Sequence, residues 1–217
     1  MNWQQSAREQ MIQQQVRAWE VLDPEVLDVM ARVPRERFVP QSHAALAFAD
    51  IAVPLPDGQH MLPPKVVGRI LQAVTLSRRD RVLEIGTGSG FLTACLARLA
   101  GPVRSLEMRS LLADQARQTL SALRAGTVEV VTADAFAPGA LNGDWDVIVL
   151  TGSLPRYDSR FERLLAPGGR LFAVVGDAPL MTARLISRSG DSYSAVDLFE
   201  TEVAPLTHAP TTDPFVF

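Results

Sequence analysis

Three alternating glycines follow an acid in the stretch Glu84-Ile85-Gly86-Thr87-Gly88-Ser89-Gly90. The mostly apolar residues 81–85 predict a short strand that ends at this turn. Apolar side chains recur at helical spacing over residues 92–99 and predict a helix directly after it. Glycine permits positive φ and close backbone approach, and the first turn of a helix leaves N–H groups unpaired. The stretch therefore predicts a ligand-binding turn between a strand and a helix.

Two common nucleotide-binding turns do not fit this spacing. A dinucleotide fingerprint, Gly-x-Gly-x-x-Gly, would need its third glycine where Phe91 stands. A P-loop would need a following Lys-Ser/Thr pair, which this chain lacks. An acid before alternating glycines instead resembles the turn of class I S-adenosylmethionine-dependent methyltransferases. Their donor carries a cationic sulfonium and an ammonium group but no phosphate, so an acid such as Glu84 is electrostatically favourable there.

Strands and helices alternate downstream of this turn. Further helical patterns cover residues 65–75, 111–124 and 160–165, and further strand patterns cover residues 103–107, 128–132, 146–150 and 170–175. This alternation indicates a parallel sheet covered on both faces. Residues 180–188 and 193–203 flank a Ser-Gly-Asp turn and predict an antiparallel hairpin at the sheet edge. We therefore predict an α/β fold with a Rossmann-like, doubly wound, mostly parallel sheet, a C-terminal antiparallel hairpin and an N-terminal helical extension.

The N-terminal extension consists of two predicted helices and a long loop. Apolar residues are interspersed with a Gln-rich face over residues 11–22, and the Asp-Pro pair at 23–24 provides a cap and first residue for a second helix. Residues 38–64 are proline-rich and irregular, and long loops of this kind are usually functional or mobile. We divide the chain into this extension, residues 1–64, which packs on the core and is not independent, and a donor-binding domain, residues 65–217.

Two further acids stand where strands end. Glu107 ends the second predicted strand of the domain, and Asp134 follows the third. Open α/β sheets bind ligands at the C-terminal ends of their strands. We expect Glu107 to accept both ribose hydroxyls and Asp134 to accept the adenine amino group. The residues predicted to bind the donor are Glu84, Gly86, Thr87, Gly88, Gly90, Glu107, Met108, Ala133, Asp134, Ala135 and Thr151.

Motifs beyond the glycine turn resemble one family, the protein-L-isoaspartate O-methyltransferases. The resemblance extends from about Arg8 to Leu206. Its motifs are Met11-Ile12-Gln13-Gln14-Gln15-Val16-Arg17, Asp23-Pro24-Glu25-Val26-Leu27, Val33-Pro34-Arg35-Glu36-Arg37-Phe38-Val39-Pro40, Ala47-Phe48-Ala49-Asp50, Gly58-Gln59, Leu83 to Gly90, and Val203-Ala204-Pro205-Leu206, which looks like the family's closing strand. The resemblance implies methylation of the α-carboxylate of isoaspartyl residues in damaged proteins. Because that carboxylate is ionised at neutral pH, catalysis needs no general base and rests on positioning and electrostatics.

The chain departs from this family at the substrate side. After Gly-Gln the family continues Thr-Ile-Ser-Gln-Pro, and its serine contacts the substrate carboxylate; this chain has His60-Met61-Leu62-Pro63-Pro64. Leu62 cannot donate a hydrogen bond that contributes roughly 1.5–3 kcal/mol, which corresponds to roughly ten- to a hundred-fold in rate. A second departure is Ala18-Trp19-Glu20, where the family usually has a glycine after its basic pair. A third is Gly152-Ser153-Leu154, where the family has an alanine-rich run. Weakened repair activity and a changed acceptor both fit.

The predicted substrate-binding residues are therefore Gln59, His60, Leu62 and Ser153. His60 is either a base for a hydroxyl acceptor or, as we favour, a surface loop histidine. Arg35 and Arg37 either attract a carboxylate substrate or are ordinary exposed arginines, and the sequence favours neither. We predict no metal site.

Composition and charge limit the classes of binding partner and the compartment that we expect. The 217 residues carry a net charge of −3 with 21% charged and 47% hydrophobic residues, so a broad nucleic-acid footprint is not expected. No apolar run spans a bilayer, no signal peptide is recognisable, and the single Cys fits a reducing compartment; we expect a cytoplasmic protein, monomeric or dimeric. Three functions stay open: an isoaspartyl carboxyl methyltransferase, a methyltransferase for another protein or small-molecule acceptor, and a non-catalytic donor-binding module.

Overall fold

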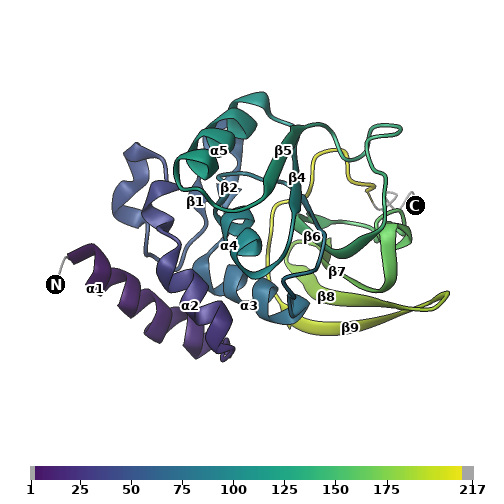
Figure 1. Cartoon of the computed structure of the whole chain (residues 1–217), viewed down its shortest axis with the longest axis horizontal. Helices are drawn as coiled ribbons and strands as arrows, with labels where there is room; N and C mark the ends of the chain where they lie inside the picture. Colours follow the sequence, from purple (N-terminus) through teal and green to yellow (C-terminus); the bar gives the residue numbers. More distant parts are fainter. Residues whose placement is uncertain (1–2, 212–217) are drawn as a thin grey trace, which may run out of the picture.

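The computed structural model describes residues 3–211 and contains one central seven-stranded sheet (Figure 1). Its strand order is β5-β4-β3-β6-β7-β8-β9. The strands are β3 Val82–Ile85, β4 Val103–Glu107, β5 Val128–Thr132, β6 Trp145–Leu154, β7 Leu165–Asp177, β8 Leu180–Ser189 and β9 Ser192–Glu200. Neighbouring strands from β5 to β7 are parallel, whereas β7, β8 and β9 form an antiparallel meander. The predicted fold class is confirmed, including the C-terminal hairpin.

The central position of β3 determines where a ligand can bind. Val82 of β3 lies opposite Val103 of β4 on one side and Val147 of β6 on the other, and all four β3 residues are buried. The chain leaves β3 toward β4 and returns later on the far side of β3 as β6. Open sheets of this kind bind ligands at such a switch point, beyond the C-terminal ends of the strands.

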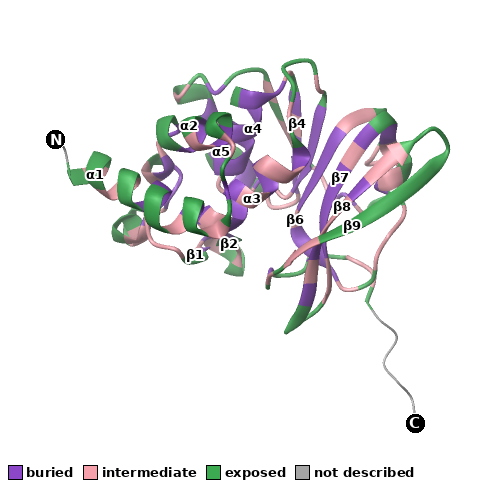
Figure 2. Ribbon diagram, turned by 90° about the horizontal axis from the view of Figure 1, so that it is seen from below, coloured by how far each residue is buried: buried purple, intermediate pink, exposed green. Residues whose placement is uncertain are grey.

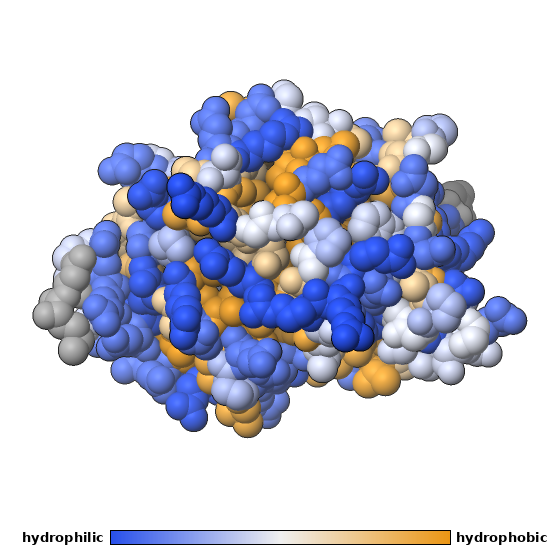
Figure 3. Space-filling model, viewed as in Figure 1, coloured by the Kyte–Doolittle hydropathy of each residue, from blue (hydrophilic) through white to orange (hydrophobic). Residues whose placement is uncertain are grey.

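The helices gather on one side of the sheet (Figures 1 and 2). They are α1 Trp3–Gln10, α2 Pro24–Arg32, α3 Pro64–Val74, α4 Phe91–Leu99 and α5 Ser110–Ala122. α2 begins as predicted, because the Asp23 side chain accepts hydrogen bonds from the N–H groups of Glu25 and Val26. Among residues 3–211 no helix is long and apolar enough to cross a bilayer. The face drawn in Figure 3 is mostly hydrophilic, with apolar atoms in the gaps between polar side chains.

Two predictions about secondary structure were wrong. The helix predicted at residues 160–165 is a single 3-10 turn, Glu162–Leu164, because Leu165 is already extended and pairs with Trp145 as the first residue of β7. The second face of the sheet is therefore covered by irregular segments rather than helices. The loop predicted at residues 38–64 contains a 3-10 helix, Gln41–Leu46, and a small hairpin in which β1 (Val53–Pro54) pairs with β2 (His60–Met61).

The N-terminal segment packs closely against α3. After α1 it continues as a π-helical turn, Met11–Val16, and a 3-10 turn, Arg17–Trp19. A Cβ placed on Gly68 of α3 would lie 2.9 Å from Val16 Cγ1, 3.0 Å from Val21 Cγ2 and 3.2 Å from Met30 Sδ. Side chains from both regions share one buried apolar cluster. We propose on this basis that residues 1–64 do not fold independently of residues 65–217.

Gly68→Ala tests this packing. Helix propensity alone would stabilise the variant by up to about 1 kcal/mol. Overpacking against Val16, Val21 and Met30 should instead lower its free energy of unfolding by about 1–3 kcal/mol. Urea denaturation of both proteins measures the difference. Unchanged or increased stability would contradict the close contact between the extension and α3.

Candidate functional site

A cavity of about 530 Å³ opens beyond the C-terminal ends of β3, β4, β5 and β6. This volume lies within the range of small-molecule sites. Most residues predicted from the sequence line it: Gln59, His60, Leu62, Glu84, Gly86, Thr87, Gly88, Glu107, Met108, Ala133, Asp134, Ala135 and Thr151. Within the described part of the chain, Gly90 and Ser153 are not among the lining residues. The structure thus brings together side chains from the glycine turn, three strand ends and the β1–β2 hairpin.

The glycine turn approaches β6 more closely than a side chain would allow. Gly86, Gly88 and Gly90 have φ values of +93°, +52° and +86°. A Cβ on Gly86 would overlap the Thr151 hydroxyl, which donates to the Gly86 carbonyl at 2.7 Å and lies 2.9 Å from the Ile85 carbonyl. Thr151 therefore uses its hydroxyl proton to hold the turn. Gly90 is buried and serves packing, because a Cβ there would contact Ala116 and Leu120 of α5 at 3.3 Å.

Glu84 lies beneath this turn and is fully buried. Its Oε2 accepts hydrogen bonds from Thr93 Oγ1 at 2.5 Å and Ser105 Oγ at 2.6 Å, whereas Oε1 has no partner among the described residues. Burial raises the pKa of Glu84 to about 7, against the opposing effect of the Ser105 and Thr93 hydrogen bonds and with a further contribution from the charge of Glu107. A cation placed in the cavity would favour the ionised form.

Glu107 joins the glycine turn to the start of α5. Its Oε2 accepts the Gly88 N–H at 2.9 Å, and its Oε1 accepts the Arg109 N–H at 3.0 Å. Each carboxylate oxygen has two lone pairs, so both oxygens can still accept a hydroxyl group. The geometry permits the predicted contact with a diol.

Asp134 has a partner that the sequence did not indicate. Its Oδ1 accepts the Phe136 N–H at 2.8 Å, and its Oδ2 lies 2.7 Å from His208 Nδ1. Burial favours a higher pKa for Asp134, but the Phe136 and His208 hydrogen bonds and the charges of His208 and Arg160 outweigh it and lower the pKa. The separation of 74 residues between Asp134 and His208 left no sequence signal for this contact.

Three of the four predicted substrate residues, Gln59, His60 and Leu62, line the cavity. His60 is exposed and Leu62 is half-buried, and Met181 and Glu202 lie along the same cavity. Ser153 is fully buried, and its backbone pairs with Ala204 and Leu206. The structure therefore does not bring the Ser153 side chain to the cavity, because this part of β6 is covered by the C-terminal segment. That segment forms one isolated bridge, between Ser153 and Pro205, rather than the closing strand that the resemblance implied.

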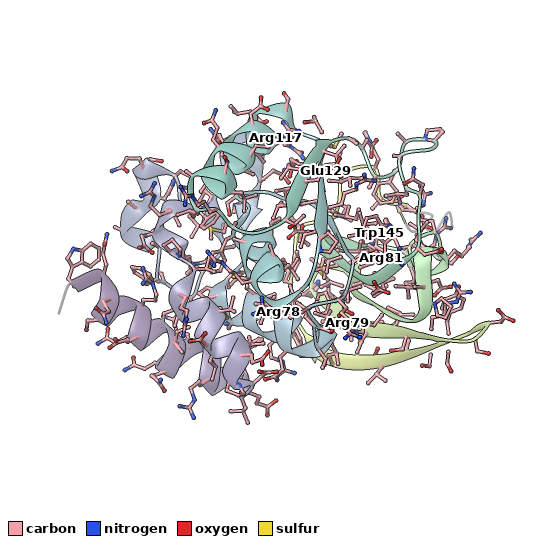
Figure 4. The ribbon with its side chains drawn as sticks, in the orientation of Figure 1. Arg78, Arg79, Arg81, Arg117, Glu129 and Trp145 are labelled. Carbon is pink, nitrogen blue, oxygen red and sulfur yellow. The ribbon has the colours of Figure 1, made fainter. Side chains whose placement is uncertain are left out.

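The electrostatic character of the cavity is acidic. Its lining includes four carboxylates, those of Glu84, Glu107, Asp134 and Glu202. Arg109 is the only arginine or lysine among the lining residues described. Arg78 and Arg79 precede β3 and therefore lie at the opposite end of that strand (Figure 4). The described residues contain no group of three or more His, Cys, Asp or Glu side chains that could hold a metal ion.

Arg35 supports the backbone that carries the predicted substrate residue Leu62. Its side chain is fully buried, its Nε donates to the Ala47 carbonyl at 2.9 Å, and its Nη2 donates to the Leu62 carbonyl at 2.9 Å. The guanidinium also lies over the ring of Phe91, 4.8 Å from its centroid, and burial lowers the pKa of Arg35 to about 10. Arg35 therefore holds the backbone at Leu62 rather than attracting a substrate from solvent. Its neighbour Arg37 is exposed and is not among the cavity-lining residues described.

The Arg35→Met variant tests whether Arg35, unlike Arg37, stabilises the fold. The variant leaves the buried carbonyls of Ala47 and Leu62 without donors, which should lower the free energy of unfolding by about 2–4 kcal/mol. Arg37→Met is the matched control and should change stability by less than about 0.5 kcal/mol. Urea denaturation gives both values. Equal stability of the two variants would contradict the supporting role of Arg35.

Comparisons with known proteins agree with this geometry. Residues 6–210 match the family model described as Protein-L-isoaspartate(D-aspartate) O-methyltransferase (PCMT). The chain is 38% identical over 204 residues to Protein-L-isoaspartate O-methyltransferase 1 of Rhodopseudomonas palustris, covering 92% of this chain and 82% of that protein. It is also 38% identical over 208 residues to Protein-L-isoaspartate O-methyltransferase 2 of Pelobacter propionicus, covering 95% and 92%.

A solved structure shares the fold. A crystal structure from Plasmodium falciparum of a putative protein-L-isoaspartate O-methyltransferase, in complex with S-adenosyl-L-homocysteine, superposes with a TM-score of 0.77. It is 18% identical and the match covers 94% of this chain and 97% of that one. The acidic cavity, the open glycine turn and the two strand-end carboxylates fit a cationic nucleoside donor. The chain therefore belongs to the protein-L-isoaspartate (D-aspartate) O-methyltransferase family and is an S-adenosylmethionine-dependent methyltransferase.

Proposed function

We propose that this enzyme methylates a carboxylate of isoaspartyl residues in protein or peptide acceptors. Two relatives that match most of the chain carry this activity in their names. The observation that carries the proposal is the cavity that places the glycine turn, Glu107 and Asp134 around one space, together with Gln59 and His60. The chemistry also fits, because an ionised carboxylate needs no general base. We further propose that the enzyme works in the cytoplasm, since its single cysteine, Cys95, is buried and unbridged.

The donor-binding residues have separate tasks in this proposal. S-Adenosylmethionine supplies an electrophilic methyl group on a sulfonium. Glu107 would bind the ribose hydroxyls and Asp134 the adenine amino group, while Gly86 and Gly88 let the backbone approach the donor. The buried carboxylate of Glu84 would stabilise the positive charge at the amino-acid end. Catalysis then rests on holding the acceptor carboxylate in line with the methyl group.

A second candidate function follows from the acceptor end. The Leu62 side chain offers no hydrogen bond, and Glu202, which lines the same cavity, is an acid rather than a base. Both features favour a neutral or cationic acceptor over a carboxylate. A methyltransferase of the same family that acts on a different protein site or small molecule would use the same donor cavity.

A methyl-transfer assay with a synthetic isoaspartyl peptide tests the main proposal. We expect incorporation of labelled methyl groups that are released as methanol under mild base, and no incorporation with the matching aspartyl peptide. Calorimetry with S-adenosylhomocysteine on the same sample verifies that the donor site is intact. Donor binding without turnover on the isoaspartyl peptide would favour the second candidate function. Failure on a broad acceptor panel as well would point to a donor-binding module without catalysis.

The Leu62→Ser variant tests whether the absence of a serine hydroxyl at this position limits the reaction rate. A new hydrogen bond to the acceptor carboxylate should raise kcat/KM for the isoaspartyl peptide by roughly ten- to a hundred-fold. Leu62→Ala is the matched control, because it shortens the side chain without adding a donor. An equal gain in both variants would show that space, not hydrogen bonding, limits the acceptor. Strong activity in Leu62→Ser with none in the wild type would mean that the native pocket serves another acceptor.

The raised pKa of Glu84 predicts opposite effects of pH on stability and on donor binding. The folded state keeps the Glu84 proton up to about pH 7, whereas the unfolded state loses it near 4.5, so the wild type loses stability as pH rises through this window. Glu84→Gln removes this loss and should gain up to about 3 kcal/mol relative to wild type between pH 5 and pH 8. Thermal melts at several pH values measure the gain.

The Glu84→Gln variant also tests whether Glu84 contributes to donor affinity. Wild-type affinity for S-adenosylmethionine should rise between pH 6 and pH 8 as Glu84 ionises beside the cationic ligand. In Glu84→Gln this rise should be smaller, and binding at pH 8 should be weaker than in the wild type. Calorimetry at both pH values provides the comparison, and identical pH profiles would exclude Glu84 as the counter-charge.

A further inference from the structure

The segment that follows β9 returns across the cavity and forms part of its wall. We call residues 203–209 the C-terminal strap. Its first half is fixed to β6, because Ser153 N donates to the Ala204 carbonyl and Leu206 N donates to the Ser153 carbonyl, both at 3.0 Å. Residues from Val203 to Thr207 line the cavity. In Figure 1 this yellow segment runs from β9 back toward β6.

Two side-chain contacts fasten the second half of the strap to the donor end. Arg109, just beyond β4, donates from Nη2 to Thr207 Oγ1 at 3.3 Å. His208 Nδ1 lies 2.7 Å from Asp134 Oδ2, just beyond β5. The strap therefore connects β6 to the residues that follow β4 and β5. These are the positions to which we assign the ribose and adenine contacts.

The backbone at His208 is held in an uncommon conformation. Its φ is +66°, in the left-handed region, and the turn closes through a hydrogen bond from Ala209 N to the Leu206 carbonyl. Such a conformation costs a non-glycine residue of order 1 kcal/mol or more, although His, Asn and Asp tolerate it better than most. A strained backbone conformation persists where contacts with the surrounding residues hold it in place. Here the strain orients the imidazole toward the carboxylate of Asp134.

Charged groups face this contact from three segments of the chain. Asp134 faces His208 from the segment after β5, and Arg160, which is itself paired with Asp158 at 2.6 Å, faces Asp134 from the segment before β7. Arg109 reaches the strap from the segment after β4. A carboxylate offers about four acceptor positions, of which the Phe136 N–H and His208 use two. Asp134 can therefore bind His208 and an amino group at the same time.

We propose that His208 is a positioning residue for donor binding, which clamps the Asp134 carboxylate in place for the adenine amino group and ties the strap over the nucleoside end. The proposal rests on the assignment of Asp134 to the adenine. A carboxylate already fixed by two hydrogen bonds loses less rotamer freedom when the ligand binds, so the ordering cost is met before binding. The clamp is strongest when His208 is protonated, because the hydrogen bond is then charge-assisted.

Calorimetry with S-adenosylhomocysteine tests the clamp in the full-length protein at pH 6 and pH 8. His208→Ala should weaken binding by about five- to thirty-fold, as expected for the loss of a hydrogen bond to a charged group. His208→Asn tolerates the same backbone conformation and can still donate, so its affinity should lie within about three-fold of wild type at pH 8. His43→Ala, which alters a half-buried histidine outside the described cavity lining, is the control for a general effect of losing a histidine.

The ratio of variant to wild-type Kd at each pH isolates His208 from the titration of Glu84, which is common to all the proteins. A merely structural strap would lower the melting temperature of His208→Ala and leave this ratio near one at both pH values. Wild-type affinity in His208→Ala at both pH values would overturn the proposal. An equal loss in His208→Ala and His208→Asn at pH 8 would also overturn it, because rescue by a neutral donor is required.

Asp134→Asn distinguishes failure of the clamp from failure of the adenine assignment. If Asp134→Asn binds S-adenosylhomocysteine as wild type does, the assignment of Asp134 to the adenine fails, and the clamp fails with it. If Asp134→Asn weakens binding while His208→Ala does not, only the clamp fails. The clamp predicts that the double variant binds no more weakly than Asp134→Asn alone, since His208 acts through Asp134.

Discussion

The buried carboxylate of Glu84 is the constraint on which the donor end depends. It receives hydrogen bonds from Thr93 on α4 and Ser105 on β4, so one side chain fixes the end of β3 relative to both α4 and β4. Thr87 of the turn bonds the same Ser105 at 2.5 Å. A buried acid without a counter-charge is costly, and the cost is reduced either by a proton or by a cation in the cavity. The positive charges of a sulfonium and an ammonium group can therefore stabilise the buried carboxylate of Glu84.

The donor half of the molecule was predictable because its residues follow local rules. Strand patterns, the cap at Asp23 and the position of Glu107 at the end of β4 depend only on nearby sequence and on the geometry of parallel sheets. The glycine turn excluded phosphate-binding motifs by spacing alone. The family resemblance then supplied the expected activity, which neither periodicity nor composition contains.

The remaining features arise from contacts between distant segments. Arg35 resembles an exposed arginine in sequence, and only the fold shows that it donates to the carbonyls of Ala47 and Leu62. Ser153 follows a strand end like a ligand-binding residue, but the returning C-terminal segment covers it. The predicted helix at residues 160–165 failed because β7 starts early to pair with β6. In each case tertiary pairing outweighed the local pattern.

The β8–β9 hairpin also affects which residue of the C-terminal strap faces Asp134. The pairing of β8 with β9 contains a register shift between Ala183 and Arg184, and β9 ends at Glu200. Each residue of extended chain advances about 3.3 Å and reverses the direction of its side chain. One residue more or fewer after this hairpin would present Thr207 or Ala209 to Asp134 in place of His208. The number of residues between β9 and the strap therefore selects which chemical group meets the donor end.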